Sequence, residues 1–182
     1  MSISLVNDHK FFNNKKNVSF FFKDETNENN FETRKEDDFI FILANNKVVG
    51  LNVLNYERYF PIEEGFHKIS NKVKKYLLNK FSNYLKEEDF TSFYKIGQVI
   101  KIENHPSSEK LKVLKVIFND QERQIITNFQ NIELNKNYLF AISGAITYSG
   151  LKIVNSKVMN VLSEGMIISY HSLGINQEGL VN

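Results

Sequence analysis

His105 comes nearest to catalytic chemistry of all residues in this chain. Its imidazole could act as a general base, because histidine exchanges protons near neutral pH. A base of this kind works on a nucleophile held within reach, and no nucleophile or carboxylate stands at a motif spacing from His105. The alternative is a turn residue whose ring bonds to backbone beside Pro106. We favour the turn, and we expect no catalytic residue and no enzyme activity.

Metal and cofactor chemistry find no better support. The chain has no cysteine, and His9, His67 and His171 show no metal-ligand spacing. Paired acids at Asp37-Asp38 and Glu63-Glu64 could serve an enzyme in the first half, but solvated loops explain them better. No glycine-rich phosphate loop is present either. We therefore expect no metal and no cofactor.

Three lysines stand where an ammonium group could reach a nucleic-acid phosphate. Lys110 follows the turn at His105, and Lys152 and Lys157 flank a later loop. Lysine contacts to phosphate give binding that weakens as salt is added. At each position a simply solvated lysine is the alternative. These three residues are candidates for RNA binding.

Four uncharged residues complete the set of candidate RNA-binding residues. Asn128 and Asn131 could bond to bases or to 2′-hydroxyl groups, or could equally cap turns in a chain rich in asparagine. Ser163 could bond to RNA or cap the turn at Gly165, where glycine permits a close backbone approach. Met166 could pack under a base or fill the core of a barrel.

Charge gives only weak support for a polyanionic partner. The formal net charge is +2. Residues 1–93 hold 14 basic and 14 acidic side chains, and residues 94–182 hold 9 and 7. The N-terminus lacks a basic start followed by an apolar run, and no apolar stretch approaches the ~18 residues that a membrane span needs. We expect a cytoplasmic protein with no membrane association.

The first half mixes strand and helix patterns, which predicts an α+β domain over residues 1–90. Asn45-Asn46 between two apolar runs predicts a hairpin, because asparagine tolerates the left-handed conformation. Apolar residues at helical spacing after Ser70 predict a helix over residues 71–85 with Ser70 as its N-cap. The polar, acidic stretch over residues 24–38 predicts a loop. The predicted strands are residues 18–22, 39–43 and 48–54.

The second half consists of short strand-like runs separated by turns, and it holds six of the eight glycines. The predicted strands are residues 96–102, 111–118, 123–127 and 138–142, with later pairing from residues 152–154 and 166–169. Five or so strands in under ninety residues, with no long helix, are typical of the OB-fold, a small β-barrel. We predict an all-β OB-fold barrel over residues 91–182.

Short motifs follow one another in a fixed order through this second half. They are Gly97-Gln98-Val99, His105-Pro106, Lys110-Leu111, Ile125-Ile126-Thr127, Asn131-Ile132, Ala141-Ile142-Ser143-Gly144-Ala145, Ser149-Gly150-Leu151-Lys152-Ile153, Lys157, Val161-Leu162-Ser163-Glu164-Gly165-Met166 and Leu173-Gly174. In this order they resemble the tRNA-binding OB domain of the endothelial-monocyte-activating-polypeptide type. That domain also occurs in many methionyl-tRNA synthetases and in the bacterial phenylalanyl-tRNA synthetase beta chain.

The first half resembles the N-terminal region of stand-alone bacterial proteins of the YtpR type, which pair an α+β domain with this barrel. The resemblance implies a non-catalytic protein that binds tRNA or other structured RNA through one face of the OB fold and its flanking loops. It also implies that the seven candidate residues form the RNA-binding site. An aminoacyl-tRNA synthetase is a further possible partner, and strand edges leave a homodimer open.

Two departures from the family pattern leave an alternative open. The family usually has Gly-Ala before the asparagine matched by Asn131, where this chain has Asn128-Phe129-Gln130. It usually has Arg-Gly before the valine matched by Val161, where this chain has Met159-Asn160. Loss of that arginine removes one strong phosphate donor. The alternative is a protein-interaction module that docks an aminoacyl-tRNA synthetase or another partner and has little RNA affinity.

Overall fold

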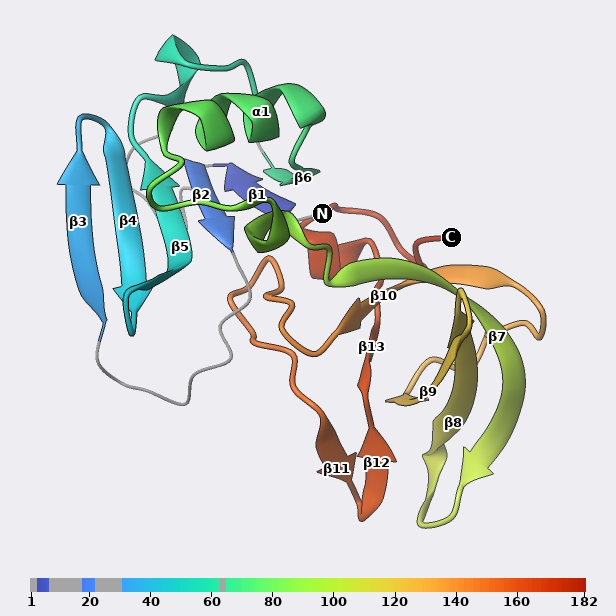
Figure 1. The fold of residues 1–182 in the computed structure, drawn as a ribbon. Helices are drawn as coiled ribbons and strands as arrows, with labels where there is room; N and C mark the ends of the chain where they lie inside the picture. Colours follow the sequence, from blue (N-terminus) through green and yellow to red (C-terminus); the bar gives the residue numbers. More distant parts are fainter. Residues whose placement is uncertain (1–2, 7–17, 22–30, 63–64) are drawn as a thin grey trace. The chain divides into compact units, whose positions relative to one another are not determined.

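The chain divides into two compact units, residues 1–92 and 93–182, and each has its own hydrophobic core. The computed structural model describes residues 3–6, 18–21, 31–62 and 65–182. Over these residues the chain is mostly β-structure (Figure 1).

The first unit is built on a six-stranded antiparallel sheet in the order β3-β4-β5-β2-β1-β6. Its strands are β1 (Ile3–Val6), β2 (Val18–Phe21), β3 (Glu32–Glu36), β4 (Phe39–Ala44), β5 (Lys47–Val53) and β6 (Gly65–Lys68). The predicted hairpin is confirmed, because Asn45 and Asn46 join β4 to β5 with φ angles of 50° and 61°. Residue 22 of the predicted first strand lies outside the described residues.

One helix, α1 (Asn71–Lys80), crosses one face of this sheet (Figure 1). The predicted N-cap is confirmed, since the backbone N–H of Val73 donates to Ser70 Oγ at 3.3 Å. The predicted end at residue 85 is wrong: the backbone leaves helical geometry at Phe81. Phe81 and Leu85 are nevertheless buried, because a turn after the helix keeps them against the sheet. Apolar spacing therefore continued past the end of the helix.

The predicted loop over residues 24–38 is wrong in its later part, where Glu32–Glu36 forms the edge strand β3. All five of its residues are exposed and none is apolar. The alternation of apolar and polar residues that indicates a strand is therefore missing from its sequence. It forms because Asp37 and Asp38 make a two-residue turn onto β4. Charged side chains on an edge strand also discourage pairing with another chain.

Asp38 ties the β3–β4 turn to the short helix η1 (Tyr56–Arg58). Its carboxylate accepts hydrogen bonds from the Tyr59 hydroxyl at 2.9 Å, from Asn55 Nδ2 at 3.3 Å and from Arg58 at 3.4 Å. These donors, the Tyr59 hydroxyl first, lower the pKa of Asp38 below its ordinary value. The folded state therefore favours the ionised carboxylate.

We expect Asp38→Asn to destabilise the first unit at neutral pH. Because the pKa of Asp38 is lowered by folding, its contribution is present above the pKa of the unfolded chain, about 3.9, and is lost as pH falls through the folded value. The difference in melting temperature between wild type and variant should therefore shrink between about pH 5 and pH 2. Asp37→Asn is the control, since among the described residues the exposed Asp37 carboxylate makes only a 3.7 Å ion pair with Lys80.

The second unit contains a five-stranded antiparallel sheet in the order β13-β10-β7-β8-β9 and a separate two-stranded hairpin, β11–β12. Its strands are β7 (Tyr94–His105), β8 (Ser108–Phe118), β9 (Gln121–Thr127), β10 (Asn137–Ile142), β11 (Ser156–Val158), β12 (Val161–Ser163) and β13 (Gly165–Ile167). Figure 1 shows β7 and β8 as long, strongly curved strands. Two short helices, η2 (Glu87–Phe90) before this unit and η3 (His171–Leu173) within it, complete the chain.

The core of the second unit includes Val99, Leu114, Ile125 and Phe140, all fully buried. Gly97 lets β7 approach this core, since a Cβ there would lie 2.5 Å from the Phe118 ring. The four predicted central strands are present with longer bounds. The predicted pairing of residues 152–154 is present in part: Lys152 forms an isolated bridge with Ile146, and Ile153 exchanges backbone hydrogen bonds with Gly144 and Ala145.

Candidate nucleic-acid interface

The His105 turn is the structural centre of the candidate interface. His105 ends β7 and is only 4% exposed. Its Nδ1 accepts a hydrogen bond from the Ser107 N–H at 3.1 Å, and its Nε2 lies 3.2 Å from the Val158 carbonyl oxygen. A carbonyl can only accept, so Nε2 is the donor in its contact with Val158. The turn interpretation is confirmed, and both ring nitrogens are occupied by backbone.

The bond from His105 to Val158 fastens the β7–β8 turn to the β11–β12 hairpin. The two residues are 53 positions apart in sequence. Lys110 lies just beyond this turn, at the start of β8, and Lys157 precedes Val158 in β11. The structure therefore brings Lys110 and Lys157 to the same end of the second unit, and both are exposed.

The loop after β9 lies against Lys110. Gln130 Nε2 donates to the carbonyl oxygens of Lys110 at 2.9 Å and of Asn128 at 3.1 Å. The side chains of Asn128 and Asn131 are exposed at this end. Sequence reasoning missed Gln130, which braces the loop, because its partner lies 20 positions away. Lys110, Asn128 and Asn131 thus border one surface.

Several other lysines of this unit are matched by carboxylates. Lys101 pairs with Glu103 at 3.0 Å and Lys136 with Glu133 at 2.8 Å. Lys115 pairs with Glu122 at 2.9 Å, and this hydrogen bond raises the pKa of the Lys115 ammonium. Within residues 31–62 and 65–182, neither Lys110 nor Lys157 lies within 4.0 Å of a carboxylate. Their charges remain available to an outside anion.

Ser163 is placed inside the fold. It is 4% exposed, accepts a hydrogen bond from the Ile126 N–H at 3.0 Å and donates to the Gly165 carbonyl at 3.0 Å. Next to it, the Glu164 N–H donates to the Gln124 carbonyl at 2.8 Å, and the Glu164 carboxylate accepts from the Gln124 N–H at 3.0 Å. The segment thus links β9 to β13, the two outer strands of the sheet.

We expect Ser163→Ala to destabilise the second unit by about 1–3 kcal/mol, because it leaves the buried N–H of Ile126 without a partner. Thermal or urea unfolding of the full chain would measure this loss. Ser156→Ala is the matched control, since Ser156 is the exposed serine directly opposite Ser163 in the β11–β12 hairpin. Equal stability of the two variants would contradict the assigned role of the Ser163 hydroxyl.

The remaining two candidates lie on other elements. Met166 pairs with Ala141 of β10 and is half-buried against the core. Lys152 is exposed and forms the bridge to Ile146. Met166 lies in β13 and Lys152 in the segment before β11, whereas Lys110 lies in β8, so the seven candidates are spread over several elements.

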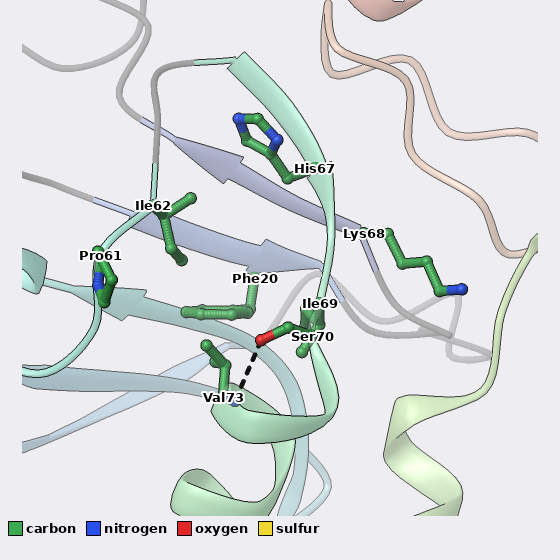
Figure 2. Close-up of a pocket in the computed structure, with 8 residues that line it drawn as sticks. All are labelled: Phe20, Pro61, Ile62, His67, Lys68, Ile69, Ser70 and Val73. Atoms are coloured by element: carbon green, nitrogen blue, oxygen red, sulfur yellow. Dashed lines mark hydrogen bonds between the residues drawn. The ribbon is translucent and has the colours of Figure 1, made fainter.

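The first unit offers a shallow hollow beside the N-terminal end of α1 (Figure 2). It is lined by Phe20, Pro61, Ile62, His67, Lys68, Ile69, Ser70 and Val73. Figure 2 shows Phe20, Ile62 and Val73 facing the hollow while Lys68 extends away from them, and the Ser70 hydroxyl is already bonded to Val73. The hollow has a mixed apolar and polar lining, and its serine hydroxyl serves as the cap of α1.

Among the described residues, no group of three or more histidine, aspartate or glutamate side chains could hold a metal ion. In the same part of the chain, no helix is both long and apolar enough to cross a membrane.

Comparison with known proteins adds to this geometry. Residues 94–182 match the family model described as "Putative tRNA binding domain". The "Phenylalanine--tRNA ligase beta subunit" of Fusobacterium nucleatum is 30% identical over 132 residues, which are 72% of this chain but only 16% of that protein. The "Putative tRNA-binding protein YtpR" of Bacillus subtilis is 28% identical over 148 residues, covering 78% of this chain and 74% of that protein.

A solved structure is similar as well: "Crystal structure of MetRS related protein from Pyrococcus horikoshii" has a TM-score of 0.35 and 27% identity. The alignment covers 42% of this chain and 66% of the chain in that structure. The family match spans nearly the whole of the second unit, from β7 to the last residue. The second unit of this chain therefore matches a family of tRNA-binding domains.

Proposed function

We propose that this chain is a non-catalytic tRNA-binding protein that recognises structured RNA through the second unit. The match of residues 94–182 to the tRNA-binding domain family carries the proposal. The Bacillus subtilis relative supports it, because that relative is named a tRNA-binding protein and is aligned over most of both chains. The exposed, unmatched cations at Lys110 and Lys157 provide a physical basis for binding phosphate.

The second unit acts, in this proposal, as an OB-type barrel preceded by an α+β domain. Strong curvature of β7 and β8, and the link from Ser163 and Glu164 across to β9, support a barrel. The sheet and the single helix α1 support the α+β description of the first unit. OB folds bind nucleic acid on a strand face and in the loops beside it.

The residues divide by the role that their surroundings permit. Lys110 and Lys157 contact phosphate groups at the end of the unit where His105 joins turn and hairpin. Asn128 and Asn131 reach bases or 2′-hydroxyl groups from the loop beside Lys110. Lys152 adds a more distant phosphate contact. Ser163 and Met166 serve the site by holding β12 and β13 in place.

The test is a titration of labelled tRNA with the full chain, followed by fluorescence anisotropy at low salt. We expect saturable binding, with circular dichroism showing that the protein is folded. Absence of binding by folded protein would contradict the function. A nuclease-resistant complex with an aminoacyl-tRNA synthetase, together with negligible tRNA binding, would indicate the protein-interaction module instead.

A further inference from the structure

The β11–β12 hairpin exposes an unusual amount of apolar surface. Met159 at its tip is 53% exposed and Leu162 in β12 is 43% exposed. Leu151 and Val154, on the segment that leads into the hairpin, are also more than half exposed. Isolated exposed apolar side chains are common, but a group of four within twelve residues suggests a contact surface.

The charged side chains within the hairpin and the segment that leads into it are all basic. Between Glu133 and Glu164 the sequence contains no aspartate or glutamate, but it contains Lys136, Lys152 and Lys157. Of these, Lys136 is paired with Glu133, whereas Lys157 has no carboxylate within 4.0 Å among the described residues. An apolar surface with an unmatched cation beside it is complementary to a partner that combines apolar groups with negative charge.

The apolar and cationic side chains share one face of the hairpin. Lys157 lies directly opposite Leu162 in the β11–β12 register, and paired residues point to the same face. The next pair, Val158 and Val161, points to the other face and is half-buried. Val158 is also the residue that His105 holds. The face with Lys157 and Leu162 is therefore the outer one.

The hairpin is anchored on both strands. His105 holds Val158 of β11, and Gln124 Nε2 donates to the Leu162 carbonyl at 2.7 Å. The tip is a two-residue turn in which Met159 and Asn160 have φ angles of 45° and 68°. Such a turn favours asparagine and glycine, so the conformation of the turn does not explain a methionine at its first position.

On the basis of the proposed function, we propose that this hairpin contacts unpaired bases of the bound RNA. Met159 and Leu162 pack against exposed base faces while Lys157 binds a neighbouring phosphate. Methionine suits this role, because its thioether makes favourable contacts with aromatic rings and Met and Leu act as wedges against bases. Unpaired loop bases are the partners, since side chains cannot read the deep, narrow major groove of duplex RNA.

The experiment compares the wild-type chain with the double variant Met159→Asn/Leu162→Thr. Asparagine suits the left-handed turn and threonine suits a strand, so the hairpin keeps its structure while its apolar surface is lost. Ile96→Thr is the control, because Ile96 is 56% exposed on β7 outside the hairpin. Affinity is measured by anisotropy for tRNA and for a fully paired RNA duplex, at several salt concentrations.

We expect the double variant to bind tRNA roughly three- to tenfold more weakly at every salt concentration. The slope of log affinity against log salt should stay unchanged, because no charge is removed. Binding to the duplex, and tRNA binding by the control, should change less than about twofold.

Each other outcome has a distinct meaning. Failure of folded wild-type protein to bind tRNA contradicts the proposed function and this inference together. Wild-type tRNA binding that the double variant retains in full overturns this inference alone, as does an equal loss for tRNA and duplex. Binding of vesicles of phosphatidylglycerol and phosphatidylcholine that only the double variant loses, with tRNA binding intact, would overturn it in favour of a membrane contact.

Discussion

Replacement of Gly165 by alanine is expected to be the most damaging single change in the second unit. An alanine Cβ at this position would lie 2.6 Å from the backbone oxygen of Ala141. Ala141 cannot move away, because it lies in β10 between β7 and β13 and pairs with both. Gly165 cannot move either, since Ser163 and Glu164 beside it are bonded to β9. One of these backbone contacts must therefore break.

We expect a loss of about 3 kcal/mol, at the upper end of overpacking effects, because backbone must shift rather than a side chain. For a unit of this size, the melting temperature should fall by about 10–20 °C. Calorimetry of the full chain would resolve the transition of the second unit. Gly50→Ala is the control, because its nearest neighbour is the flexible end of Ile42 at 3.2 Å. A melting temperature within a few degrees of wild type would show that the strands can separate without cost.

Features that depend on local chemistry were predicted correctly from the sequence. The Asn45-Asn46 turn and the Ser70 cap need only the conformational preferences of residues that are neighbours in the chain. The turn at His105 also belongs to this class, since its ring bonds to Ser107 two residues away. Each of these predictions required no knowledge of the rest of the fold.

Features that depend on distant partners could not be predicted in the same way. β3 has no apolar alternation, and its strand structure comes from pairing with β4. Ser163 was a candidate RNA ligand. Its buried hydrogen bond with the Ile126 N–H spans 37 positions, and a single sequence does not show that two residues so far apart come together. The ion pair of Lys101 with Glu103 is different: two residues apart on a strand share one face, so this signal was present in the sequence.

The second large effect concerns RNA affinity. We expect the double variant Lys110→Ala/Lys157→Ala to bind tRNA at least about tenfold more weakly than wild type, because a hydrogen bond to a charged group contributes about 1.5–3 kcal/mol. Its stability should be close to that of wild type, since both side chains are exposed and make no ion pair with the described residues. Lys101→Ala/Lys115→Ala is the control, because these two lysines are matched by Glu103 and Glu122.

The most direct test of the central claim is the salt dependence of tRNA binding by the wild type and by these two double variants. If Lys110 and Lys157 each contact a phosphate, log affinity should fall linearly with log salt for the wild type. The slope of the Lys110→Ala/Lys157→Ala variant should be shallower by about 1.5, and that of the control variant should be nearly unchanged. Wild-type binding without salt dependence, or an equal change of slope in both variants, would contradict RNA binding at this end of the second unit.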